Sequence, residues 1–100
     1  MPFRYDALVA TLTTLPRVEA GQMFGKACLK SGGKAFVALH RDDMVFKLTG
    51  AEHAEALAQP GARLWDPSGK GRSMREWVAL PEASDELAGR LALAALAYVS

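Results

Sequence analysis

Residues 31–48, which read SGGKAFVALHRDDMVFKL, decide the fold of this chain. Residues 31–33, Ser-Gly-Gly, are a strong signal for a β-hairpin turn, and residues 34–39 continue with extended, apolar character. Residues 41–43 make a second turn signal before another short apolar run at residues 44–48. The stretch therefore predicts two strands joined by a short connection, which makes them antiparallel.

The segment before this stretch predicts one helix and one further strand. Residues 18–30 have extended character and complete a three-stranded meander. The helix is predicted over residues 5–15 and ends before Pro16. Its apolar positions recur at helical spacing and draw one stripe. They are Tyr5, Leu8, Val9, Leu12 and Leu15.

The segment after residue 48 predicts a helix and two strands. Thr49 and Glu52 have the spacing of a capping box, in which the hydroxyl and the carboxylate each bind a backbone N–H of the first helical turn. An alanine-rich helix then runs to about residue 58. Two short apolar runs, at residues 62–65 and 74–80, are joined by a glycine-containing loop.

A last helix is predicted from Ser84, which is a favourable N-cap residue, to about Val99. The order of elements is then helix, three strands, helix, two strands, helix. We expect an α+β fold, a two-layer sandwich with one five-stranded antiparallel sheet.

Composition bounds the class of protein. One hundred residues suit a single domain spanning residues 1–100. The net charge of +1 argues against a polyanion-coating tail. One cysteine excludes an internal disulfide and suits a reducing compartment. There is no signal-like segment and no run of about eighteen apolar residues. These features predict a soluble, cytoplasmic protein that has no membrane partner.

Several spaced motifs resemble the N-terminal domain of the TfoX/Sxy competence-regulator family, within the wider YjbR/MmcQ-like group. The residues that carry the resemblance are Met23, Phe24, Gly25, Phe36, Phe46, Lys47, Met74, Glu76, Trp77 and Pro81. The chain departs from the family pattern at Lys26, where members usually have a second glycine. The resemblance implies the same order of elements, in a fold similar to that of secretion chaperones, and a regulatory or protein-interaction role without a cofactor.

Catalytic and metal-binding patterns are missing from the sequence. His40 ends a strand and His53 lies in the alanine-rich helix, and a structural or surface role suits each. No spacing of histidine and cysteine is typical of a metal site. We therefore expect a non-enzymatic protein without catalytic residues, metal or cofactor.

A basic loop is the first candidate site. Residues 66–73 contain Lys70 and Arg72, and Arg63 and Arg75 flank them. Basic and aromatic residues together bind single-stranded nucleic acid, and a glycine-containing loop can form an anion nest. These four residues are thus a possible anion or nucleic-acid contact, and the alternative is a solvated hairpin loop.

Cys28 is the second candidate. Alternation places it on the same strand face as Lys26 and Lys30, whose charges favour a thiolate. The hypothesis is an accessible, mildly activated thiol, with an enzyme using Cys28 as an alternative function. The competing interpretation is an inert, half-buried cysteine.

The last helix supplies the third candidate. Its residues 91–99 carry no charge, so one sheet cannot cover every apolar side. The stripe predicted to pack on the sheet consists of Leu87, Leu91, Ala94 and Tyr98. Leu93, Leu96 and Val99 are predicted to point elsewhere. Either the first helix covers them or Leu93 and Leu96 form the contact of a homodimer, and a protein partner is expected in general.

Overall fold

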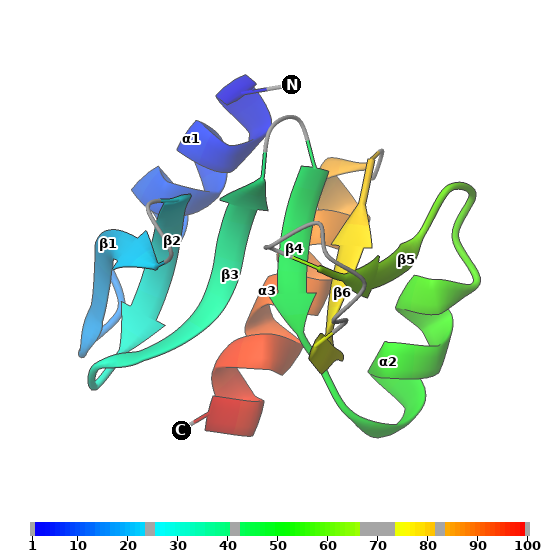
Figure 1. The fold of residues 1–100 in the computed structure, drawn as a ribbon. Coiled ribbons are helices and arrows are strands. Elements are labelled where there is room, and N and C mark those ends of the chain that lie inside the picture. The colour runs from blue at the N-terminus through cyan, green and yellow to red at the C-terminus, as the bar shows by residue number, and fades with distance from the viewer. Residues whose placement is uncertain (1, 24–25, 41–42, 67–73, 82–83, 100) are drawn as a thin grey trace.

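The computed structural model of the chain describes residues 2–23, 26–40, 43–66, 74–81 and 84–99. Over these residues the elements are α1 (Pro2–Leu12), β1 (Val18–Met23), β2 (Lys26–Ser31), β3 (Lys34–His40), β4 (Asp43–Lys47), α2 (Gly50–Leu57), β5 (Arg63–Trp65), β6 (Met74–Leu80) and α3 (Asp85–Val99). Helices α1 and α3 lie on the same face of the sheet, and α2 lies beside β5 (Figure 1). The predicted α+β class is confirmed.

The sheet has six antiparallel strands in the order β1-β2-β3-β4-β6-β5, so the predicted number of five is wrong. The stretch 18–30 is two paired strands, in which Val18 faces Ser31 and Met23 faces Lys26. Only residues 24–25 separate these strands, and the single glycine there is a weaker turn signal than Gly32-Gly33. The break was therefore hidden inside an uninterrupted extended pattern.

The turn between β2 and β3 forms as predicted. Ser31 pairs with Lys34, which leaves Gly32 and Gly33 as the two turn residues. Their φ angles are +57° and +84°, the left-handed values that a type I′ hairpin requires at both positions. The glycine pair thus fixes the register of this hairpin.

Helix α1 ends at Leu12, three residues before the predicted end at Leu15. The hydroxyl of Thr13 donates to the carbonyl of Val9 at 2.5 Å, and that of Thr14 donates to the carbonyl of Thr11 at 2.6 Å. Such local side-chain bonds compete with continued helix. Leu15 consequently lies beyond the helix and is exposed.

The two other helices begin differently. The Ser84 hydroxyl accepts the backbone N–H of Leu87 at 3.1 Å, which confirms the predicted cap of α3. Thr49 stands at the N-cap of α2, but its side chain makes no capping hydrogen bond, so the predicted capping box is wrong. Gly50 has φ +62°, and this non-helical first residue changes the path of the backbone that the hydroxyl would cap.

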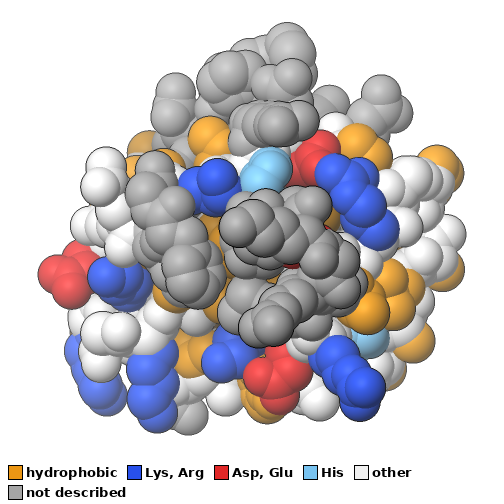
Figure 2. All heavy atoms as spheres, in the orientation of Figure 1, with side chains coloured by type: hydrophobic (Ala, Val, Ile, Leu, Met, Phe, Trp, Pro, Cys, Tyr) orange, Lys and Arg blue, Asp and Glu red, His pale blue; other side chains and the backbone are white. Residues whose placement is uncertain are grey.

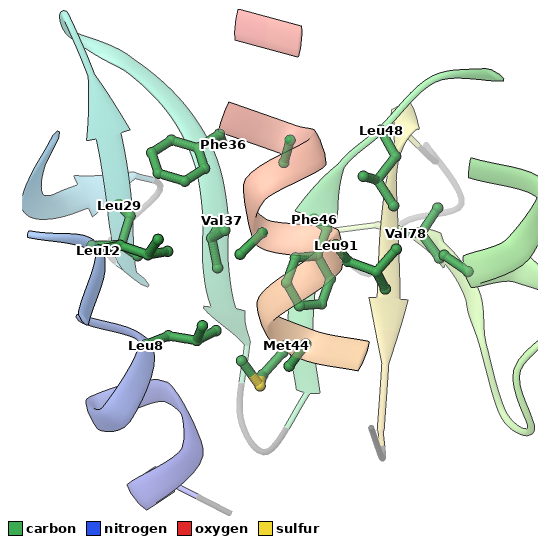
Figure 3. Close-up of a cluster of buried hydrophobic side chains, with 14 of the residues drawn as sticks. Leu8, Leu12, Leu29, Phe36, Val37, Met44, Phe46, Leu48, Val78 and Leu91 are labelled. Atoms are coloured by element: carbon green, nitrogen blue, oxygen red, sulfur yellow. The ribbon is translucent and has the colours of Figure 1, made fainter. Parts of the chain in front are cut away.

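The helix face of the sheet, the side covered by α1 and α3, carries the larger core cluster (Figure 3). Leu29 pairs with Val37 whereas Lys30 pairs with Ala35, so Phe36 is the extra residue of a β-bulge. The bulge lets the neighbours Phe36 and Val37 join the same cluster, although regular alternation would separate them.

Helix α3 packs on the sheet with a different stripe from the one predicted. Its buried residues are Ala88, Leu91, Ala92, Ala95 and Val99. The alanines allow the helix axis to approach the strands closely, which rotates Ala94 and Tyr98 toward the edge of the contact. Of the predicted stripe, Leu91 is fully buried and Tyr98 is exposed.

Candidate functional site

An apolar groove lies between α1 and α3, on the side of the molecule that carries the helices. Its volume is about 440 Å³. None of the lining residues that the structure describes carries a charge, and only two threonines among them are polar. The groove is lined by Ala7, Leu8, Thr11, Leu12, Thr14, Leu15, Ala88, Gly89 and Leu93. It opens to solvent, and we call it the α1–α3 groove.

The two residues predicted as a dimer contact are separated by the structure. Leu93 lies at the groove and is 53% exposed, the most exposed large apolar side chain among the described residues. Leu96 is half-buried and packs against the core cluster. The first helix does not cover Leu93 in the way that one of the two sequence-based alternatives expected, because the groove lies between α1 and α3 at this position.

Gly89 is a groove residue that the sequence analysis did not single out. A glycine inside a helix lowers the stability of the helix by about 1 kcal/mol relative to alanine. A glycine in the middle of the predicted last helix was therefore the sequence feature that could have drawn attention to this position. A Cβ atom at Gly89 would meet no other atom within 4 Å. The residue therefore widens the groove instead of permitting a close contact within the chain.

The opposite face of the sheet is closed by aromatic and small side chains. Its buried residues are Cys28, Ala38, Val45, Trp65, Trp77 and Ala79, and we call it the tryptophan face. Trp65 and Trp77 are 2% and 5% exposed, and their ring centroids lie 5.3 Å apart. This burial leaves neither indole accessible for stacking on bases.

Only part of the predicted basic site lies in the described residues. Lys70 and Arg72 fall outside them. Arg63 donates to the Asp43 carboxylate at 2.6 Å, so its charge is already balanced, whereas the Arg75 side chain is exposed. Figure 2, which views the tryptophan face, shows basic side chains spread over this side of the molecule, several of them grouped at the lower left, with acidic side chains among the others.

The two histidines hold structural contacts, one of which joins the tryptophan face. His53 Nε2 donates to the carbonyl of Arg75 at 2.7 Å and links α2 to β6. Trp65 Nε1 donates to His40 Nδ1 at 3.0 Å. The sequence analysis missed this second pair because twenty-five positions separate the two residues and no motif connects them.

The accessible thiol predicted at Cys28 is wrong. Cys28 is 0% exposed, and its burial raises the pKa of the thiol, an effect that the charge of Lys30 only partly offsets. The strand spacing placed the three side chains correctly on one face. The long lysine side chains carry their ammonium groups toward water, however, while the short cysteine side chain stays beneath the aromatic cluster.

Ionic contacts secure α3 at two points. Arg90 donates to both carboxylate oxygens of Glu55 at 2.6 and 2.7 Å, and this bond lowers the pKa of Glu55. The Tyr98 hydroxyl donates to Glu76, which raises the pKa of the phenol. Lys47 lies 5.9 Å from the centroid of the Tyr98 ring. These contacts hold the helix that forms one wall of the groove.

Within the described ranges, no three His, Cys, Asp or Glu side chains gather as metal ligands. In the same ranges, no helix has the length and apolar character needed to cross a bilayer. Comparisons with protein-family models, with curated proteins and with solved structures found no match.

Proposed function

We propose that this chain is a small, non-enzymatic interaction or regulatory domain of the cytoplasm, of the TfoX N-terminal type. In this proposal the α1–α3 groove binds an apolar segment of a protein partner. The observation that carries the proposal is a groove of about 440 Å³ whose described lining is uncharged, with a leucine, Leu93, 53% exposed at its side.

The chemistry of the groove supports this kind of partner. A contact with charged groups would desolvate them without a counter-charge in the lining, which is unfavourable. An apolar side chain loses only its contact with water on entering, which is favourable by about 25 cal/mol per Å². Amphipathic helices bind in such grooves by their apolar side, so a helical segment is the partner that the groove fits.

Gly89 offers a way to test the groove without touching the core. The variant Gly89→Leu places a large side chain in the open groove, and Gly89→Ala is its matched control because a methyl group leaves most of the volume open. A photo-crosslinking residue at Leu93 reports contacts inside cells, and the same residue at the exposed position Glu19 on β1 is the second control.

The proposal expects a discrete protein adduct from position 93 and none from position 19. Gly89→Leu is expected to abolish the adduct, and Gly89→Ala to keep it. Equal crosslinking at both positions, or an adduct that persists unchanged in Gly89→Leu, contradicts the proposal. Sedimentation of the purified chain at about 100 μM separates the homodimer from a different partner, because a specific interface has micromolar or tighter affinity.

A further inference from the structure

The hydrogen bond between Trp65 and His40 fixes the protonation state of the histidine. An indole N–H only donates, so the Nδ1 atom of His40, 3.0 Å away, accepts with a lone pair. His40 is therefore neutral, with its proton on Nε2. Trp65 is 2% exposed, and a buried N–H of this kind is normally paired with an acceptor.

The strand that carries Trp65 is weakly held by its backbone. Strand β5 has three residues and lies at the end of the sheet, where β6 is its one neighbour among the strands that the structure describes. Its register shifts between Leu64 and Trp65, which interrupts the ladder. Side chains therefore supply much of its attachment to the tryptophan face.

Two side-chain links connect β5 to the middle of the sheet, and they lie next to each other. Trp65 bonds to His40 at the end of β3, and Arg63 bonds to Asp43 at the start of β4. His40 and Asp43 are cross-strand partners. The acceptors of both links are thus neighbours, and a change of charge at one acts on the other.

We propose that His40 is a protonation-sensitive latch for strand β5. A proton from solvent that binds Nδ1 turns the acceptor into an N–H donor, which then faces the indole N–H of Trp65. The hydrogen bond breaks, and the imidazolium competes with Arg63 for the Asp43 carboxylate. Acidification thereby weakens both links that hold β5 to the middle of the sheet.

Some of the charged groups on the tryptophan face favour protonation of His40, and others oppose it. Asp43 on β4 favours the imidazolium. Arg63 on β5 disfavours it, as does Lys26 on β2, since Cys28 pairs with Ala38 and alternation puts Lys26 on the same face as His40. Asp66 follows Trp65 directly and adds negative charge at the end of β5. An unfolded histidine titrates near pH 6.5, so a folded state that favours the neutral ring begins to lose stability below that pH.

The test compares the parent with His40→Gln, whose side-chain oxygen accepts the indole N–H at every pH and does not titrate. His53→Gln is the matched control, because His53 is the other of the two histidines in the chain. The measurements are the indole N–H resonances and the histidine ring resonances by NMR from pH 7.5 to 5.0, together with the denaturant unfolding equilibrium at each pH.

In the parent and in His53→Gln, the Trp65 indole resonance is expected to shift or exchange faster as His40 titrates. The unfolding constant of the parent is expected to rise relative to that of His40→Gln, by up to about tenfold per pH unit below about pH 6.5. In His40→Gln the indole resonance is expected to stay constant. A His40 ring that stays neutral throughout, or that titrates without moving the Trp65 resonance, overturns the latch.

Discussion

The two faces of the central strands bury their side chains in different ways. The helix face uses large residues such as Phe36 and Phe46 beneath two helices. The tryptophan face uses small residues such as Ala38 and Cys28, with two indole rings in the same cluster. Because β3 and β4 are buried on both sides, they appear in the sequence as almost continuous apolar runs. The side-chain links Trp65–His40 and Arg63–Asp43, by contrast, lie at the margin of the tryptophan face.

The helix face is expected to dominate stability, and neighbouring residues on β4 test this. Phe46 is fully buried on the helix face, and Val45 is fully buried on the tryptophan face. Phe46→Ala is expected to lower the free energy of unfolding by about 3–5 kcal/mol, because it leaves a large cavity. Val45→Ala removes two methyl groups and is expected to cost about 2 kcal/mol. Urea unfolding measures both, and an equal loss would contradict the comparison.

The accessibility of Cys28 measures how firmly the tryptophan face is closed. Burial slows alkylation of Cys28 in the folded state in two ways. It hides the sulfur from the reagent, and it raises the pKa of the thiol, which lowers the fraction of reactive thiolate. We expect native alkylation near pH 8 to be slower than that of the urea-unfolded chain by roughly a hundredfold, which corresponds to about 2.7 kcal/mol. Similar rates in the two states would show that this face opens readily.

The Trp65–His40 bond is expected to contribute less than either core. Trp65→Phe keeps most of the ring but removes the donor, and His40→Phe removes the acceptor. A double-mutant cycle built from these variants is expected to give a coupling of about 1 kcal/mol at pH 7.5. Urea unfolding of the parent, both single variants and the double variant provides it. Additive losses would mean that the bond adds nothing to the tryptophan face.

Gly89, in the wall of the α1–α3 groove, tests whether the helix face contains a position that keeps the groove open and thereby lowers the stability of the protein. Gly89→Ala is expected to raise the free energy of unfolding by a little under about 1 kcal/mol, because alanine favours helix and its Cβ meets no atom within 4 Å. Thermal unfolding of parent and variant is the measurement. A destabilised Gly89→Ala would indicate that the groove is closed in solution.

The smallest effect is expected at the surface pair of Glu55 and Arg90. Arg90 lowers the pKa of Glu55, so the pair adds stability above the unfolded value near pH 4.3 and loses it as pH falls through the folded value. NMR titration of the Glu55 carboxyl is expected to show a low midpoint that returns to its ordinary range in Arg90→Gln. Salt of about 1 M is expected to weaken the shift, since both groups are solvent-exposed.

The sequence-based predictions succeeded where the information is local. The β2–β3 turn follows from two glycines that tolerate positive φ, and the start of α3 follows from the Ser84 hydroxyl. They failed where a weak local signal depended on its surroundings. Residues 18–30 divided into two strands, and the Thr49 side chain did not cap its helix. The pairing of β1 with β2 decided the first feature, and the backbone path at Gly50 decided the second. A short sequence pattern contains neither of these.

The sequence by itself determined the α+β class, the positions of most elements and the face on which Cys28 lies, because turn residues and apolar periodicity act over a few residues. Only the tertiary structure decided that Cys28 is covered, that Leu93 is exposed while Leu96 is not, and that His40 accepts from Trp65. These features depend on which distant side chains fill the space above each strand and helix. That space is set by how the layers pack, through contacts between residues far apart in the chain.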